Sequence, residues 1–203
     1  MYYSIIPIQS NAFFSIKSIY YKKQLKQVYY MKKSNNIIIR YIILATIGFL
    51  LHFTYDWSGQ NNIVGLFSAT NESTWEHLKL LFFPMLFITI WDSLRGNTSP
   101  GFLKRRIMSI MAGMVVIVVM FYTALGVTSR LMDWYNIATY LISLLATLLL
   151  DKFITVEDNL YSAYTALALF ILFTVAFAVF SFKAPDIGIF YPFPAGTKCF
   201  PIV

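Results

Sequence analysis

The stretch IMSIMAGMVVIVVMFYTALGVT, residues 107–128, decides the fold class of this chain, because its 22 residues include no charged side chain. A lipid hydrocarbon core about 30 Å thick requires about 20 consecutive apolar residues in one helix. Four further, predominantly apolar runs lie near 37–57, 77–94, 134–150 and 161–182. None of the five shows the period-two alternation of a membrane β-barrel. We therefore predict an all-α, polytopic membrane bundle with about five transmembrane helices.

The charge distribution predicts how this bundle is oriented. The chain has 58% hydrophobic and only 12% charged residues, against about 25% charged in ordinary soluble domains, and a net charge of +7. Because cytoplasmic loops are rich in Lys and Arg, the N-terminus is predicted inside and the C-terminus outside. Basic inner segments suit anionic lipid headgroups, which we favour over nucleic acid as the partner of this charge. The basic residues concerned are Lys17, Lys22, Lys23, Lys26, Lys32, Lys33, Arg40, Arg95, Lys104, Arg105 and Arg106.

The charge distribution and the apolar runs divide the chain into three segments. Residues 1–36 form a basic cytoplasmic segment, for which two interpretations stay open. It is either an amphipathic helix on the inner membrane surface, or residues 1–30 are a non-native extension, because Met31 starts a basic stretch followed by an apolar run. That run is typical of an uncleaved signal anchor, and together with the other four runs it predicts a multi-pass membrane protein. Residues 37–182 form the bundle, and 183–203, rich in Pro and Gly, form an outer tail that contains the single cysteine, Cys199.

Ionisable and polar residues gather at the predicted outer end of the first two spans. His52 and Asp56 are four residues apart and therefore share a helix face. A second group lies just before and at the start of the second span. Both groups fall at the same membrane depth, and ionisable residues within spans are functional by default as a hypothesis. The candidate polar site therefore comprises His52, Asp56, Asn71, Glu72, Glu76 and His77.

Part of the second group has a simpler interpretation. Residues 73–76 read Ser-x-x-Glu, the pattern of a helix-capping box in which Ser73 accepts from the Glu76 amide and the Glu76 side chain reaches back to Ser73. Lys79 can pair with Glu76 at i+3. Ser73 and Glu76 are therefore predicted as the cap that begins the second span.

The remaining residues fit a metal site. His52, His77 and Glu72 would give two imidazoles and a carboxylate, a ligand set that zinc uses in hydrolases while it keeps one position open for water. A spare carboxylate would serve as general base. A divalent metal such as zinc is thus the cofactor to consider, although the compact His-x-x-x-His spacing is absent.

The stretch HFTYDWSGQNNIVGLFSATNESTWEHLKLLFFPML, residues 52–86, resembles the hallmark segment of a family of small bacterial membrane proteins, found mainly in Gram-positive bacteria and known only as a domain of unknown function. The resemblance covers about residues 31–192 and centres on the motif Asn-Glu-Ser-x-Trp-Glu-His. It implies about five spans, a location in the bacterial plasma membrane, and no established activity. The tail YPFPAGTKCFPIV departs from the family's Asp-Pro turn followed by Gly-Thr-Tyr-Gly.

Three functions stay open at this point. The first is a membrane protein whose outward-facing polar pocket binds a metal ion or polar ligand, with hydrolysis as an extension. The alternative is a non-catalytic assembly or accessory protein in which the polar cluster is a helix cap and packing contact. A proton- or cation-coupled carrier ranks last, because no acidic residue lies clearly near the bilayer midplane.

Overall fold

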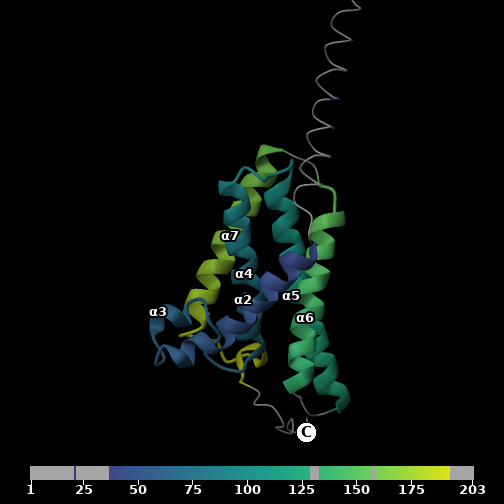
Figure 1. The fold of residues 1–203 in the computed structure, drawn as a ribbon. Helices are drawn as coiled ribbons and strands as arrows, with labels where there is room; N and C mark the ends of the chain where they lie inside the picture. The colour runs from purple at the N-terminus through teal and green to yellow at the C-terminus, as the bar shows by residue number, and fades with distance from the viewer. Residues whose placement is uncertain (1–20, 22–36, 129–132, 157–158, 193–203) are drawn as a thin grey trace, which may run out of the picture.

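The computed structural model describes residues 21, 37–128, 133–156 and 159–192. Within these residues the chain forms an all-α bundle without a strand (Figure 1). The basic segment predicted for the N-terminus lies outside the described residues except for Tyr21, and so do the end of the tail and Cys199. The elements are α2 (Ile37–Trp57), α3 (Asn62–Gly65), α4 (Thr74–Leu94), α5 (Phe102–Thr128), α6 (Asp133–Phe153), α7 (Leu160–Phe180) and the 3-10 helix η1 (Gly188–Phe190).

Five of these helices, α2, α4, α5, α6 and α7, are long and apolar enough to cross a membrane. They coincide with the five predicted spans, and the chain is a multi-pass membrane protein. Two helices begin earlier than their apolar runs do. α4 starts at Thr74 behind its cap, and α5 starts at Phe102, so that its first turns include a basic stretch.

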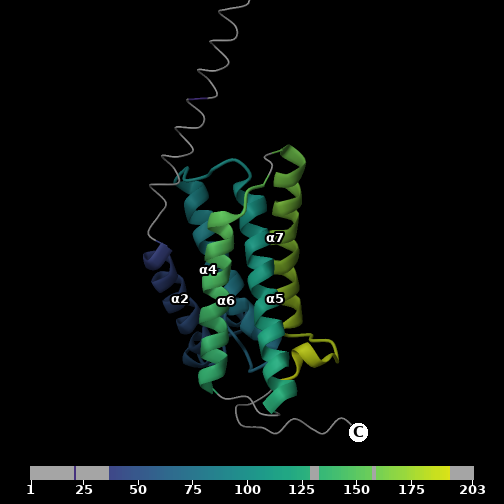
Figure 2. The same ribbon diagram turned by 90° about the vertical axis from the view of Figure 1, so that its right-hand side faces the viewer.

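α4 is the central helix of the bundle. It packs against α2, α5, α6, α7 and η1, and 56% of its apolar window is buried, against 11% for α2. α5 and α6 run side by side, α7 lies on the other side of α5, and α2 crosses the bundle obliquely (Figures 1 and 2). The polar residues of α4 are therefore shielded by neighbouring helices, whereas α2 exposes most of its surface to lipid.

Two helix crossings depend on glycine. A Cβ atom on Gly48 of α2 would lie 2.7 Å from the Leu80 carbonyl oxygen of α4, and one on Gly113 of α5 would lie 2.9 Å from a Leu81 methyl. Small residues allow such close approach between membrane helices. Glycines within the apolar run 107–128, Gly113 and Gly126, are both predicted from the sequence as helix–helix contacts. Gly113 has that packing role, whereas Gly126 has nothing within 4 Å of a Cβ position, so the prediction for Gly126 was wrong.

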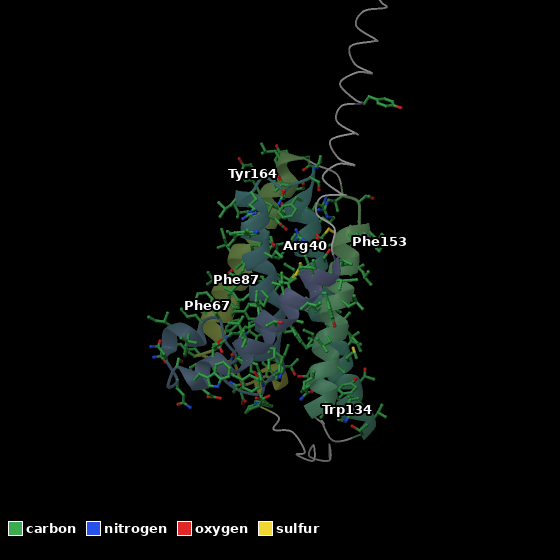
Figure 3. The ribbon with its side chains drawn as sticks, in the orientation of Figure 1. Arg40, Phe67, Phe87, Trp134, Phe153 and Tyr164 are labelled. Carbon is green, nitrogen blue, oxygen red and sulfur yellow. The ribbon has the colours of Figure 1, made fainter. Side chains whose placement is uncertain are left out.

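A buried charge cluster joins the helices at the predicted inner end. The sequence places Arg95 three residues after Asp92, which predicts an i,i+3 ion pair between them, but the carboxylate binds two other arginines. Arg40 of α2, labelled in Figure 3, donates to both Asp92 oxygens at 2.7 and 2.8 Å, and Arg106 of α5 donates at 3.0 Å. Asp92 faces inward and is 2% exposed, whereas Arg95 lies beyond the end of α4 and stacks on Trp91 at 4.2 Å.

A second acid completes this cluster. Asp151 of α6 lies 3.4 Å from Arg105 and 3.4 Å from Arg106. Arg106 is almost fully buried, and its positive charge is offset by carboxylates from two other helices. Charges are tolerated at this membrane depth because they are paired across helices.

Candidate functional site

The start of α4 is built largely as predicted. Ser73 is its N-cap, with Oγ accepting from the Glu76 amide at 3.3 Å. The second half of the predicted capping box is wrong, because the Ser73 amide donates to Asn71 Oδ1 at 2.9 Å and not to Glu76. Asn71 thus forms a local turn that leads into the helix. The side-chain oxygen of Asn71 is used within the cap.

Glu76 points away from the histidines into a buried network. Its carboxylate accepts from Lys79 Nζ at 2.8 Å, so the expected i+3 ion pair is present. The same carboxylate accepts from the Thr70 amide and from Ser181 Oγ, both at 2.8 Å, and Lys79 also donates to the Gly65 carbonyl at 2.7 Å. With 1% and 0% exposure, Glu76 and Lys79 are enclosed and fully bonded. Glu76 therefore does not take part in the candidate polar site.

Glu72, in contrast, lies between the two histidines. His52 Nε2 is 3.5 Å from one Glu72 oxygen and His77 Nε2 is 3.5 Å from the other. The two imidazole centroids are 5.5 Å apart. The three residues come from α2, the loop before α4, and α4 itself. The tertiary structure thus brings together the residues that the capping interpretation left unused.

The glycine crossing explains why the histidines meet. α2 and α4 are antiparallel, and at their crossing a Cβ atom on Gly48 would lie 2.7 Å from the Leu80 carbonyl oxygen. His52 is one turn beyond Gly48, and His77 is about one turn before Leu80, so both point to the same level of the helix pair. The geometry of this crossing therefore positions the two imidazoles.

The loop that carries Glu72 is fixed at both ends. Ser68, which is fully buried, accepts from the Tyr55 amide at 3.0 Å and donates to the Leu51 carbonyl at the end of α2. Thr70, just before Glu72, donates its amide to the Glu76 carboxylate, and Ser73, just after Glu72, is the N-cap of α4. A short segment between such anchors has little freedom, which keeps Glu72 above the imidazoles.

The hydrogen bond of His77 determines what its other nitrogen can do. His77 Nδ1 lies 2.8 Å from the Ser73 carbonyl oxygen, and a carbonyl only accepts, so Nδ1 must carry the proton. In the neutral imidazole, Nε2 is then a bare lone pair that faces a carboxylate. Two acceptors at this distance repel unless a proton or metal cation lies between them. A backbone carbonyl bound to the far nitrogen is also the usual arrangement of a metal-ligating histidine.

His52 has a different environment. Its Nε2 faces Glu72, and its Nδ1 is buried with no hydrogen-bond partner among the residues that the structure describes. Asp56 is exposed at the end of α2, one turn beyond His52. Of the six predicted site residues, three therefore converge, Asp56 stays at the rim, and Asn71 and Glu76 serve the cap and the buried network.

The distances bear on a metal ion directly. Two ligands at zinc-bond lengths of about 2.0–2.2 Å and a tetrahedral angle are about 3.4 Å apart. Both His–Glu separations are 3.5 Å. Even so, in the described part of the chain no group of three or more His, Cys, Asp or Glu residues already has the arrangement of a metal site. The three side chains approach in pairs around Glu72.

Comparison with known proteins places this chain in a family. The model of a family of unknown function, DUF6512, matches residues 24–197. The chain belongs to the DUF6512 family. The match spans the five membrane helices and all six residues of the candidate site, so the expected membership in a family without known activity is confirmed. No curated protein and no solved structure matches this DUF6512 chain.

Sequence reasoning missed the residues that complete the buried network. Ser181 and Thr70 are ordinary polar residues in the sequence, and only their contacts with Glu76 give them a role. Ser181 ends α7, more than a hundred positions from Glu76. No spacing signal in a single sequence links such distant positions.

Proposed function

We propose that this membrane protein binds a divalent cation, such as zinc, at its outer end through His52, Glu72 and His77. The observation that carries the proposal is the contact of His77 Nδ1 with the Ser73 carbonyl at 2.8 Å, which places the proton of a neutral His77 on Nδ1. In that tautomer Nε2 is a lone pair 3.5 Å from a Glu72 oxygen, where a cation would compete with a proton. A cation between Nε2 and Glu72 turns the repulsion of these two acceptors into two bonds.

The surroundings support binding from outside the bundle. The Glu72 side chain is 48% exposed and those of His52 and His77 are 25% and 15% exposed. A cation can therefore reach the three groups without unfolding a helix. Rotation of the side chains, with the helices fixed by the glycine crossing, would bring the imidazole nitrogens to a common centre. A zinc ion with three protein ligands keeps a position for water whose pKa falls near 7, which would open a route to hydrolysis.

The runner-up is a non-catalytic assembly or accessory role. It is favoured by the Glu76–Lys79 network, which ties α4 to α7 and to the loop after α3 without any exposed group. In that case Glu72 and the two histidines would be polar residues at the edge of this helix–helix contact, with no ligand to bind. Measurement of cation binding separates the two functions.

The cation site can be tested with purified full-length protein in detergent. A chelator first removes bound metal from the protein, which is then titrated with zinc. The wild type should bind one zinc ion per chain, and the His52→Ala, His77→Ala double variant should bind none at that site. Glu72→Gln, which keeps the shape but removes the charge, should bind at least tenfold more weakly. Asp186→Asn removes an exposed carboxylate from the predicted outer tail and is the matched control, with unchanged binding.

Stability provides a second readout. Zinc at a hundred times its dissociation constant should raise the free energy of unfolding of the wild type by about 2.7 kcal/mol and leave the double variant unchanged. Equal zinc binding by the wild type and the double variant would exclude the cation site. The double variant could lose zinc binding only because it is less stable even without zinc. Glu72→Gln then decides, because it removes a ligand charge while it keeps the shape of the side chain.

We also propose that the histidine end faces outward, in accordance with the distribution of basic residues. The single cysteine, Cys199, follows α7 in the sequence and should then react with a membrane-impermeant thiol reagent in intact cells. Labelling only after permeabilisation would reverse the orientation.

A further inference from the structure

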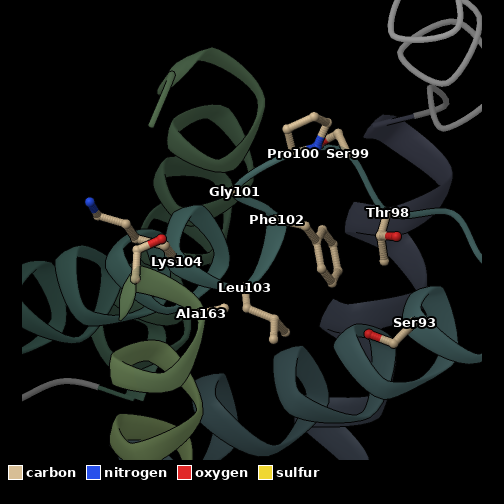
Figure 4. Close-up of a pocket in the computed structure, with 10 residues that line it drawn as sticks. Ser93, Thr98, Ser99, Pro100, Gly101, Phe102, Leu103, Lys104 and Ala163 are labelled. Atoms are coloured by element: carbon tan, nitrogen blue, oxygen red, sulfur yellow. The ribbon is translucent and has the colours of Figure 1, made fainter. Parts of the chain in front are cut away.

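A separate cavity lies at the opposite end of the bundle from the histidines. It has a volume of about 390 Å³ and opens where α4 ends and where α5 and α7 begin (Figure 4). This volume falls within the range of small-molecule sites, about 300–1,000 Å³. Its lining residues are Ser93, Thr98, Ser99, Pro100, Gly101, Phe102, Leu103, Lys104, Ser162 and Ala163.

The polar part of this lining is rich in hydroxyl groups and carries positive charge. Figure 4 shows Ser93 and Thr98 on one side of Phe102 and Lys104 on the other, with the Lys104 side chain extending away from the ring. Arg105 Nη1 donates to Ser99 Oγ at 2.9 Å, which brings a guanidinium to the cavity wall. Hydroxyl, ammonium and guanidinium groups are the usual ligands of phosphate oxygens.

Negative groups are directed elsewhere. Among the described residues, none that lines the cavity is acidic. The nearby carboxylates of Asp92 and Asp151 are engaged by the arginines of the buried charge cluster. Glu157 and Asp158 precede α7 in the sequence and lie outside the described residues. The described surroundings therefore favour an anion.

The other part of the lining is apolar. Phe102, Leu103, Pro100 and Ala163 line the cavity, and Phe102 is buried between it and the Arg106 guanidinium, 5.0 Å from the ring. The cavity thus has hydroxyl and basic groups beside an apolar wall, at the end of a membrane helix. A phospholipid has the matching chemistry where its phosphate joins the glycerol backbone. A free phosphate would use only the polar half.

We propose that this cavity binds the phosphate headgroup of an anionic phospholipid. Ser99 and Thr98 supply hydroxyl groups, the Lys104 side chain turns toward the ligand from the other side of Phe102 to supply the charge, and Phe102 and Ala163 contact the glycerol region. The arginine that holds Ser99 Oγ keeps that side chain in place for the ligand. This site is independent of the proposed cation site, since it lies at the other end of the helices.

The test uses the purified full-length chain in a neutral detergent and titration calorimetry with three probes: short-chain phosphatidylglycerol, short-chain phosphatidylcholine and inorganic phosphate. The wild type should bind phosphatidylglycerol at least tenfold more tightly than the other two. Lys104→Gln should weaken that binding about tenfold through loss of a charged contact. Ala163→Leu fills the cavity without changing charge and should weaken it similarly. Lys183→Gln removes the same charge from the far end of α7 and is the control.

Each result has a defined meaning. Selective loss in Lys104→Gln and Ala163→Leu, with Lys183→Gln unchanged, supports the headgroup site. Equal affinity for the two lipids, or an equal loss in all three variants, overturns it in favour of nonspecific lipid or charge effects. Inorganic phosphate that binds as tightly as phosphatidylglycerol replaces the lipid with free phosphate as the ligand. If one site variant fails to fold, as judged by its melting temperature without ligand, the other still decides.

Discussion

Substitution of Gly48 by alanine tests the crossing that positions both histidines. The added Cβ would lie 2.7 Å from the Leu80 carbonyl oxygen and would also clash with the Tyr140 hydroxyl oxygen. The tyrosine side chain can swing away at the cost of its 3.0 Å hydrogen bond to the Leu44 carbonyl, but the Leu80 oxygen is part of the α4 backbone. An ordinary contact of 3.4 Å requires α2 to move by about 0.7 Å.

Overpacking of this kind costs typically about 1–3 kcal/mol. We therefore expect Gly48→Ala to lower the free energy of unfolding by that amount in an SDS titration followed by far-UV circular dichroism. Because the shift separates His52 from His77, zinc affinity measured by calorimetry should fall as well. The two readouts link helix packing to the proposed site.

The matched control is Gly126→Ala in α5. A Cβ there meets nothing within 4 Å, so alanine adds no clash and removes the conformational cost of a helical glycine. Its stability should equal or exceed that of the wild type by up to about 1 kcal/mol. If Gly48→Ala proves as stable as Gly126→Ala and binds zinc with wild-type affinity, close approach at Gly48 does not set the site.

Three further outcomes can be checked with the same SDS titration. Lys79→Met leaves Glu76 as an unpaired buried carboxylate and should lower the free energy of unfolding by about 3–5 kcal/mol. Lys183→Met, the control at an exposed position, should leave the free energy of unfolding nearly unchanged. Equal effects of the two substitutions would contradict a buried Lys79–Glu76 pair. Asp92→Asn removes the shared acceptor of two arginines and should cost a similar amount. Arg95→Gln should stay within about 0.5 kcal/mol of the wild type, and a large loss there would restore the Asp92–Arg95 pair that the structure replaces.

Part of the candidate site could be predicted from the sequence. Ser73 as the start of α4 follows from local hydrogen bonding, because a cap depends on residues within one turn. His52 and His77 could be placed at one depth, since each span fixes the distance of its residues from the membrane surface. The Ser-x-x-Glu pattern assigned Glu76 to the cap and left Glu72 for the metal site, but the partners of both glutamates on other helices could not be predicted.

The structure separates these two glutamates by what surrounds each of them. Glu76 falls on the face of α4 that α7 and the loop after α3 cover, so it pairs with Lys79 and Ser181. Glu72 lies just before the helix, where the chain passes over α2, and it faces the histidines. The predicted pairing of Asp92 failed for a related reason: its partners Arg40 and Arg106 come from other helices, and a buried carboxylate binds whichever cation the packing brings near it.

The sequence by itself determined the number of membrane helices, their approximate limits and the start of α4. These properties depend on local quantities, namely the length of an apolar run and the hydrogen bonds of one helical turn. Only the tertiary structure decided which polar groups meet. Membrane helices associate through side-chain packing, and the alignment of one helix against another cannot be derived from the apolar residues of either helix alone. The glycine contact at Gly48 sets that alignment for α2 and α4, and with it the meeting of His52, Glu72 and His77.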